Sequence, residues 1–204
     1  ASGMLRRDLA ACIGMRGDVV IAGGGGDNAA SAIGVGVVRG GEAFVSLGTS
    51  GVLFAASDAY QPDPASAVHS FCHAVPKTWH QMGVILAASD ALSWFGRVLG
   101  AAPADMTSGL GPLQAPSSTL FLPYLGGERT PHNDAVIRAS FLNLDHSTDH
   151  IAMTRAVMEG VTYAVRDSFD ALTSTGTKID RLLAVGGGSK SDYWVQAIAT
   201  ILGL

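Results

Sequence analysis

The sequence predicts an α/β protein that holds phosphate groups on main-chain N–H groups. Two short apolar strands, Val19–Ala22 and Leu182–Val185, each end at a run of glycines that opens into a helical pattern. Between them, two apolar runs flank Gly48-Thr49-Ser50-Gly51, which is the pattern of a β-hairpin. Glycine turns and helix N-termini direct unpaired N–H groups at an anion, so these turns are candidate phosphate sites.

The first glycine run precedes a single carboxylate. Gly23–Gly26 is followed by Asp27 and Asn28, just before a predicted helix over residues 29–37. Glycines permit backbone angles and close approaches that side chains block, so a carboxylate at such a corner suits a catalytic base. Asp is also a common capping residue at a helix start. This stretch alone leaves both interpretations open.

Further elements follow from the spacing of apolar residues. Helices are predicted over 3–14 and 87–99, from Ser147-Thr148-Asp149 up to Gly176, and after the second glycine turn. Strands are predicted at 43–48 and 51–56, and two more within 68–86 around Pro76-Lys77-Thr78. The Pro-, Gly-, Ala- and Ser-rich stretch 100–118 predicts a flexible surface segment, and Arg39–Glu42 a lobe boundary.

Composition argues against several classes of protein. The 204 residues carry a net charge of −4 without a basic run, which argues against a nucleic-acid partner. The chain is 48% hydrophobic with a mean hydropathy of +0.30, so we expect a well-buried core, yet no stretch is apolar for long enough to cross a membrane. Cys12 and Cys72 favour a reducing, cytoplasmic compartment over a disulfide framework.

The glycine-containing turns do not fit the common fingerprints. The glycines of 23–26 are contiguous instead of spaced as G-x-G-x-x-G, and no Lys-Ser/Thr pair follows a glycine turn as in a P-loop. The turn 48–51 lacks the G-x-S-x-G spacing of a nucleophile elbow, which argues against a serine hydrolase. Either Thr49 and Ser50 bind a phosphate, or the turn is an ordinary hairpin loop.

A histidine-rich segment raises the question of a metal site. His69, Cys72, His73 and His80 are metal-ligating residue types, and residues 69 and 73 share one face of a predicted strand. No second Cys pair completes a structural zinc site. Core packing and hydrogen bonding are therefore the favoured roles.

A polar loop over 126–134 is dense in groups that bind or are bound. It contains Glu128, Arg129 and His132. A salt-bridged loop and a role at a cleft are equally supported for these three side chains.

Taken together and in order, the motifs are more specific than any one of them. The set comprises Gly24-Gly-Gly-Asp27-Asn28, Ser46-Leu-Gly-Thr-Ser-Gly51, His69-Ser-Phe-Cys-His73, Leu122 to Asn133, Arg155-Ala-Val-Met-Glu-Gly160 and Gly186-Gly-Gly-Ser189. It resembles the FGGY carbohydrate kinases, and within that family it is most similar to the xylulokinases. The resemblance extends from about Val19 to the end of the chain.

The resemblance implies a fold and a reaction. Such kinases have two ribonuclease H-like/actin-like lobes of the actin/hexokinase/Hsp70 superfold, bind sugar and ATP in the cleft, and are more than twice as long. Residues 1–41 would be the tail of the N-terminal lobe and residues 42–204 most of the nucleotide-binding C-terminal lobe. The implied activity is phosphorylation of D-xylulose by ATP. Alternatives are another substrate (gluconate, ribulose, fuculose or glycerol), or an inactive nucleotide-binding or structural lobe.

The same resemblance implies roles for individual residues. Asp27 matches the base that accepts the proton of the attacking sugar hydroxyl, and Asn28 would help to hold the sugar. The turn Gly48, Thr49 and Ser50 matches the contact to the ATP phosphates. Gly186, Gly187 and Gly188, with Ser191 at the next helix start, match the adenosine-binding segment. Mg²⁺ would bridge the phosphates near Asp27, and no side chain is assigned as its dedicated ligand.

Three positions depart from the family pattern. Asn143 stands where the family signature has a glycine, Ala152 where it prefers a polar residue, and Ser31 where a glycine usually follows the Asp-Asn motif. None of these positions has a chemical role in the family. The implied partners are a sugar and ATP. An exposed, apolar inter-lobe surface would favour self-association, so a homodimer is a candidate state.

Overall fold

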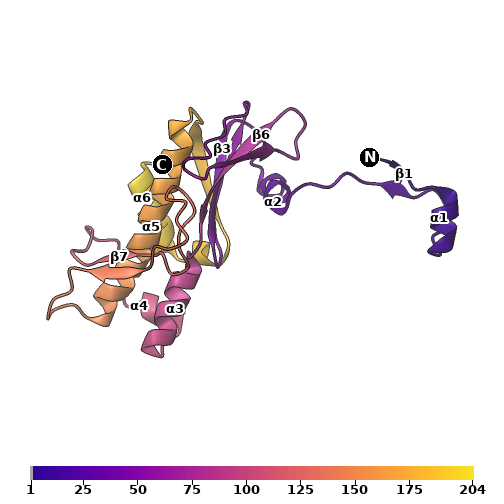
Figure 1. Ribbon diagram of the computed structural model, residues 1–204. Helices are drawn as coiled ribbons and strands as arrows, with labels where there is room; N and C mark the ends of the chain where they lie inside the picture. Colours follow the sequence, from indigo (N-terminus) through magenta and orange to yellow (C-terminus); the bar gives the residue numbers. More distant parts are fainter. Residues whose placement is uncertain (1) are drawn as a thin grey trace.

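The computed structural model describes residues 2–204 as a sheet domain with a projecting N-terminal arm (Figure 1). In the arm, β1 (Gly3–Met4) pairs antiparallel with β2 (Val20–Ile21), and α1 (Arg7–Cys12) lies between them. The helix predicted over 3–14 is therefore too long at its start, because Gly3 and Met4 pair with β2 instead. Residues 22–26 form a connector without helix or strand between the arm and the sheet domain.

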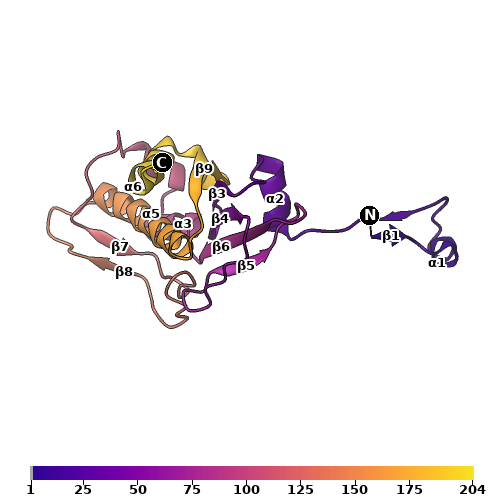
Figure 2. The ribbon, with the colours of Figure 1, turned by 90° about the horizontal axis from the view of Figure 1, so that it is seen from above.

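A five-stranded mixed sheet organises the rest of the chain (Figure 2). Its strand order is β5-β6-β4-β3-β9, and all neighbours are antiparallel except β3 and β9. The strands are β3 (Gly41–Leu47), β4 (Gly51–Ser57), β5 (His69–Cys72), β6 (Trp79–Ile85) and β9 (Ile179–Val185). Both predicted strand pairs are thus confirmed.

Helices cover both faces of this sheet. The 25-residue α5 (His150–Ser174) lies along one face beside α3 (Ser89–Leu99) and α6 (Asp192–Leu202), and α2 (Asp27–Val35) lies on the other (Figure 2). Successive side chains of a strand point to opposite faces, so β3 and β4 supply two cores. Among residues 2–204, no helix has the length and apolarity needed to cross a membrane.

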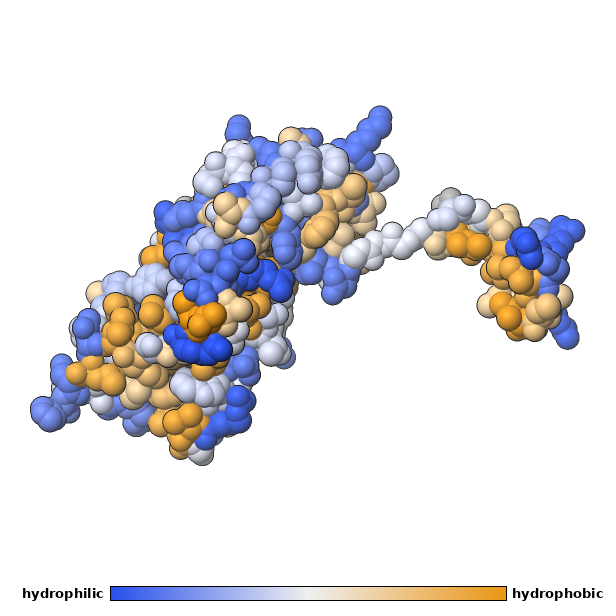
Figure 3. Space-filling view, in the orientation of Figure 1, coloured by the Kyte–Doolittle hydropathy of each residue, from blue (hydrophilic) through white to orange (hydrophobic). Residues whose placement is uncertain are grey.

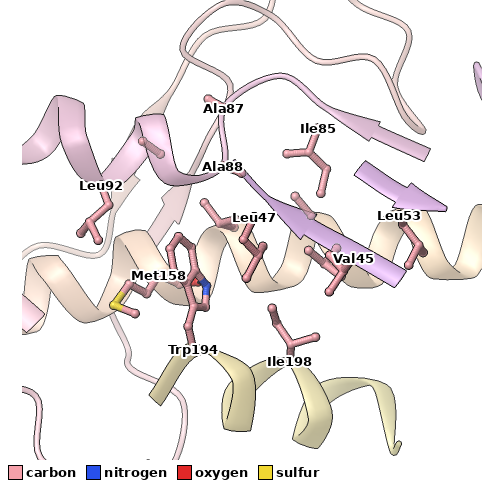
Figure 4. Packing of buried hydrophobic residues seen from close by; sticks show 14 of the residues in the cluster. Val45, Leu47, Leu53, Ile85, Ala87, Ala88, Leu92, Met158, Trp194 and Ile198 are labelled. Atoms are coloured by element: carbon pink, nitrogen blue, oxygen red, sulfur yellow. The ribbon is translucent and has the colours of Figure 1, made fainter. Parts of the chain in front are cut away.

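The larger core lies between the sheet and the α5 layer. There Val45, Leu47 and Leu53 pack against Met158 and Trp194 (Figure 4). The smaller core lies under α2 and combines Ala32 and Val37 with strand residues Phe44, Phe54, Ala56 and Met82. Because both faces are buried, nearly every residue of β3 and β4 is apolar. The spacing of apolar residues therefore predicts where these strands begin and end, but not which side chain faces which core.

The stretch 100–118 contains a helix that the sequence did not predict. Residues Pro103–Ser108 form α4, with Pro103 in its first turn and Met106 buried between α4 and α3. The prediction of a flexible segment is wrong there, because Met106 and Leu110 join the main core. A short hairpin of β7 (Leu120–Leu122) and β8 (Ser140–Leu142) follows, and η1 (Gly187–Lys190) is a single 3₁₀ turn.

Gly160 in α5 lets the helix touch β7. A Cβ atom at this position would overlap the main-chain carbonyl oxygen of Phe121. We therefore expect Gly160→Ala to lower the free energy of unfolding by about 2 kcal/mol or more, although alanine favours helices. Gly34→Ala is the matched control, because a Cβ there meets no atom within 4 Å, and should raise stability by up to about 1 kcal/mol. Equal effects in urea unfolding would contradict this packing.

His80 on β6 makes stability depend on pH. Its ring stacks on Phe54 at 4.4 Å, and burial, with a smaller effect of His73, lowers the pKa of His80 to about 4. Between pH 6.5 and 4 the unfolded chain binds a proton at His80 that the folded chain does not, so stability falls as pH falls through this window. We expect wild type to lose about 2–3 kcal/mol relative to His80→Phe between pH 7 and 4.5. A pH-independent difference between the two unfolding curves would refute this role.

Candidate functional site

The turn between β3 and β4 is held against the start of α3. Pairing of Leu47 with Gly51 leaves a three-residue loop, Gly48-Thr49-Ser50. The N–H of Ser89 donates to the Gly48 carbonyl at 2.9 Å, and the N–H of Ala88 to the Thr49 carbonyl at 3.0 Å. The carbonyls of the turn are therefore occupied, whereas the hydroxyls of Thr49 and Ser50 are exposed and have no hydrogen-bond partner within residues 2–204.

The turn after β9 lies directly on the end of β3. Gly186 has a φ of +90°, and a Cβ there would lie 3.0 Å from the Leu47 carbonyl oxygen. A Cβ on Gly188 would lie 2.7 Å from the Leu47 Cβ and 2.9 Å from the Ser89 Oγ. Glycine is therefore required at both positions for the approach of the two turns. Ser191 caps α6, since its hydroxyl accepts from the Trp194 N–H at 3.3 Å.

The two turns border one cavity of about 630 Å³. Five of the residues singled out in the sequence line it: Gly48, Thr49, Gly187, Gly188 and Ser191. Ser50 and Gly186 adjoin lining residues without lining the cavity themselves. The volume is typical of pockets that bind small molecules or cofactors.

Other elements contribute walls that the sequence did not reveal. These are α3, with Ser89, Leu92 and Ser93; α4, with Pro103, Ala104, Thr107 and Ser108; and the buried pair Met158 and Trp194. Leu47, Lys190 and Tyr193 complete the lining, which contains no carboxylate. A wall with hydroxyl groups, one ammonium group and no acidic side chain favours an anionic or polar ligand. Its contributors are too far apart in sequence for a motif to show them.

Asp27 and Asn28 do not line this cavity. Asp27 is the first residue of α2 and is exposed, while Gly26 occupies the N-cap position. Its Oδ1 atom accepts hydrogen bonds from the Asn28 N–H at 2.8 Å and from Asn28 Nδ2 at 3.3 Å. The interpretation of Asp27 as the helix cap is therefore wrong, because the cap is Gly26, one residue earlier. The Asp27 carboxylate lies at the N-terminal, positive end of the helix dipole.

The histidine-rich segment is organised by hydrogen bonds and stacking. His73 is buried, with Nε2 at 3.0 Å from the Val37 carbonyl oxygen and Nδ1 accepting from the Val75 N–H at 3.0 Å. Cys72 is exposed. In residues 2–204, no three side chains of His, Cys, Asp or Glu are arranged to hold a metal ion.

Glu128 is a buried carboxylate without an ion-pair partner in the described residues. Its Oε1 accepts from the N–H groups of Leu86 at 2.9 Å and Arg129 at 2.7 Å, and burial raises its pKa. His132 instead approaches the Tyr124 hydroxyl at 3.0 Å. The interpretation of these residues as a salt-bridged loop is therefore wrong, because Glu128 fastens the loop to the segment between β6 and α3.

Asn143 shows how a departure from the family pattern is accommodated. It has a φ of +58°, in the left-handed region that glycine adopts most readily. Asparagine tolerates this region better than most residues. The backbone conformation at this position is therefore one that either glycine or asparagine adopts at little cost.

Comparisons with known proteins agree with this fold. Residues 43–204 match the model of the C-terminal domain of the FGGY family of carbohydrate kinases. The xylulose kinase of Escherichia coli K12 is 44% identical over 204 residues, which cover 99% of this chain and 42% of that protein. The chain thus spans well under half the length of this curated relative.

Solved structures give the same result. A crystal structure described as a xyloylose kinase from Brucella ovis superposes with a TM-score of 0.91 at 61% identity, over 98% of this chain and 42% of the other. The xylulose kinase of Rhodospirillum rubrum superposes with a TM-score of 0.86 at 27% identity, over 97% of this chain and 40% of the other. The five-stranded mixed sheet and its covering helices are accordingly those of the actin-like C-terminal lobe, and this chain belongs to the FGGY family of carbohydrate kinases.

Proposed function

We propose that the cavity between the two turns is the ATP site of a sugar kinase. The observation that carries this proposal is the convergence of Gly48-Thr49 and Gly187–Ser191 on one cavity without carboxylates. The free hydroxyls of Thr49 and Ser50 would contact the phosphates. Gly186, Gly187 and Gly188, with Ser191, would border the adenosine. A glycine wall allows a nucleotide to approach the main chain, and Lys190 offsets negative charge.

Asp27 is the proposed general base of the reaction. Its carboxylate is exposed at the first turn of α2, and Asn28 fixes one of its oxygens by hydrogen bonding. The other oxygen would accept the proton of the sugar hydroxyl as that hydroxyl oxygen attacks the γ-phosphorus and ADP leaves. Phosphoryl transfer depends mainly on positioning and charge stabilisation, so one oriented base suffices. Asn28 is proposed to contact the sugar as well.

Mg²⁺ is proposed to accompany the nucleotide instead of occupying a protein cage. No group of three ligating side chains exists among residues 2–204. Mg²⁺ bound with a nucleotide typically keeps several waters and is held mainly through phosphates and one or two carboxylates. Asp27 is the carboxylate of this chain proposed to lie near it.

D-xylulose is the proposed sugar, and residues 1–41 the proposed end of a first lobe. Two curated relatives that cover 99% and 100% of this chain are named xylulose kinases. A structure at 27% identity is that of a gluconate kinase, so another sugar or polyol is the alternative. The arm exposes large apolar side chains, including Leu9, Ile13, Met15 and Val20 (Figure 3). Such a surface supports packing against further protein: the rest of a first lobe, or a second copy in a homodimer.

Removing the proposed base tests the reaction. In the full-length protein that contains this chain, Asp27→Ala should lower kcat for ATP-dependent phosphorylation of D-xylulose by about 10²–10⁴-fold. Asp170→Ala is the control, because it removes an exposed carboxylate on α5 that pairs only with Arg166. A coupled assay of ADP release over a panel of sugars measures both. Activity of Asp27→Ala within a few-fold of wild type would exclude Asp27 as the base.

A single methyl group in the cavity wall tests the nucleotide site. A Cβ on Gly187 meets no protein atom within 4 Å, so Gly187→Ala should leave the melting temperature unchanged. It should weaken binding of MgADP to the 204-residue chain about tenfold, because the methyl group occupies space beside the ligand. Gly126→Ala is equally free of contacts and lies outside the cavity lining, so it serves as the control. Equal titration calorimetry curves for both variants would argue against this site.

A further inference from the structure

We propose that the loop between β5 and β6 clamps α2 to the sheet, with His73 as a positioning residue for Asp27. This inference rests on the proposed function of Asp27 as the base. His73 and Ala74 lie next to the chain on both sides of α2 (Asp27–Val35). His73 is hydrogen-bonded to Val37, which follows the helix, and Ala74 lies close to Gly25, which precedes it. The helix that begins with Asp27 is thereby fixed at both ends.

The contact after α2 is a buried hydrogen bond. The Val75 N–H donates to His73 Nδ1, so the ring proton must be on Nε2, and Nε2–H donates to the Val37 carbonyl at 3.0 Å. His73 is only 7% exposed, and its ring meets the edge of Phe54. The Nε2 bond therefore joins Val37 to the loop, and the Nδ1 bond orients the ring within the loop. Loss of the ring would leave buried polar groups unpaired.

The contact before α2 explains one of the four glycines. A Cβ on Gly25 would lie 3.2 Å from the Ala74 Cβ, whereas a Cβ on Gly24 or Gly26 meets nothing within 4 Å. None of the residues Gly23–Gly26 has a positive φ. The connector thus has no positive φ at its glycines, and at Gly25 it passes the loop so closely that a Cβ would crowd Ala74.

Packing beneath α2 completes the attachment. Ala29 and Ala32 are buried, and Val37 packs with Phe44 and Phe54 on the sheet. The arm, in contrast, projects away beyond residues 22–26 (Figure 1). Asp27 is therefore part of the same body as β3 and the Gly48–Ser50 turn, and the distance from the base to the phosphate turn is set within the sheet domain.

Hydrogen exchange of the 204-residue chain tests the clamp without any activity measurement. His73→Phe keeps an aromatic ring but loses both hydrogen bonds. His80→Phe changes the neighbouring ring, which meets His73 edge to face, and leaves the hydrogen bond from His73 to Val37 in place. We expect amides of residues 28–35 to exchange at least tenfold faster in His73→Phe, with no change in His80→Phe or in β3. Equal exchange of α2 in the two variants would overturn the clamp.

Substitutions at Gly25 and Gly24 provide a second, independent test if His73→Phe does not fold. Gly25→Val should accelerate exchange in α2, because its side chain displaces Ala74, while Gly24→Val should not. Exchange in α2 that is the same for both would overturn the clamp.

In the full-length enzyme, the clamp variants should lower kcat tenfold or more and leave KM for ATP unchanged, whereas the control variants should do neither. Full kcat in His73→Phe would refute the positioning role. If Asp27→Ala keeps its activity, the proposed base is wrong, and the exchange data still decide whether the clamp exists.

Discussion

The candidate site depends on how closely the end of β9 approaches the end of β3. The parallel pairing of these strands brings Gly186 and Gly188 onto Leu47, at distances where any Cβ would collide with the main chain or side chain. On the other side, the N–H groups at the start of α3 hold the carbonyls of Gly48 and Thr49. One cavity results because two turns, far apart in sequence, both lie at the end of β3 beside the start of α3.

Local patterns were sufficient to predict the parts of this arrangement. The hairpin, the second glycine turn and the Ser191 cap depend on a few consecutive residues, so their sequence signals were complete. The contribution of α4 to the cavity wall was not predictable, because Met106 becomes helical and buried only through contact with the main core. The helix α3 was predicted, but not that it borders this cavity. The hydrogen bonds of Glu128 were not predictable for a similar reason. Its partners are main-chain N–H groups, one of them 42 residues away, which charge patterning cannot reveal.

The first glycine run shows where reasoning from residue type alone stops. Four consecutive glycines suggested unusual backbone angles, yet none of them has a positive φ, and only at Gly25 would an added Cβ be crowded. Asp27 lies at the expected corner, but as the first helical residue and outside the cavity. Its relation to the turn Gly48–Ser50 comes from α2 packing on the sheet, through Val37 and His73.

The proposed function requires that the cavity between the two turns binds the nucleotide. The most direct measurement is hydrogen–deuterium exchange of the chain with and without saturating MgADP. We expect slower exchange at residues 47–50, 89–93 and 187–191, which border the cavity, with little change in the arm. Protection that leaves these three segments unaffected and appears elsewhere in the sheet domain would contradict it.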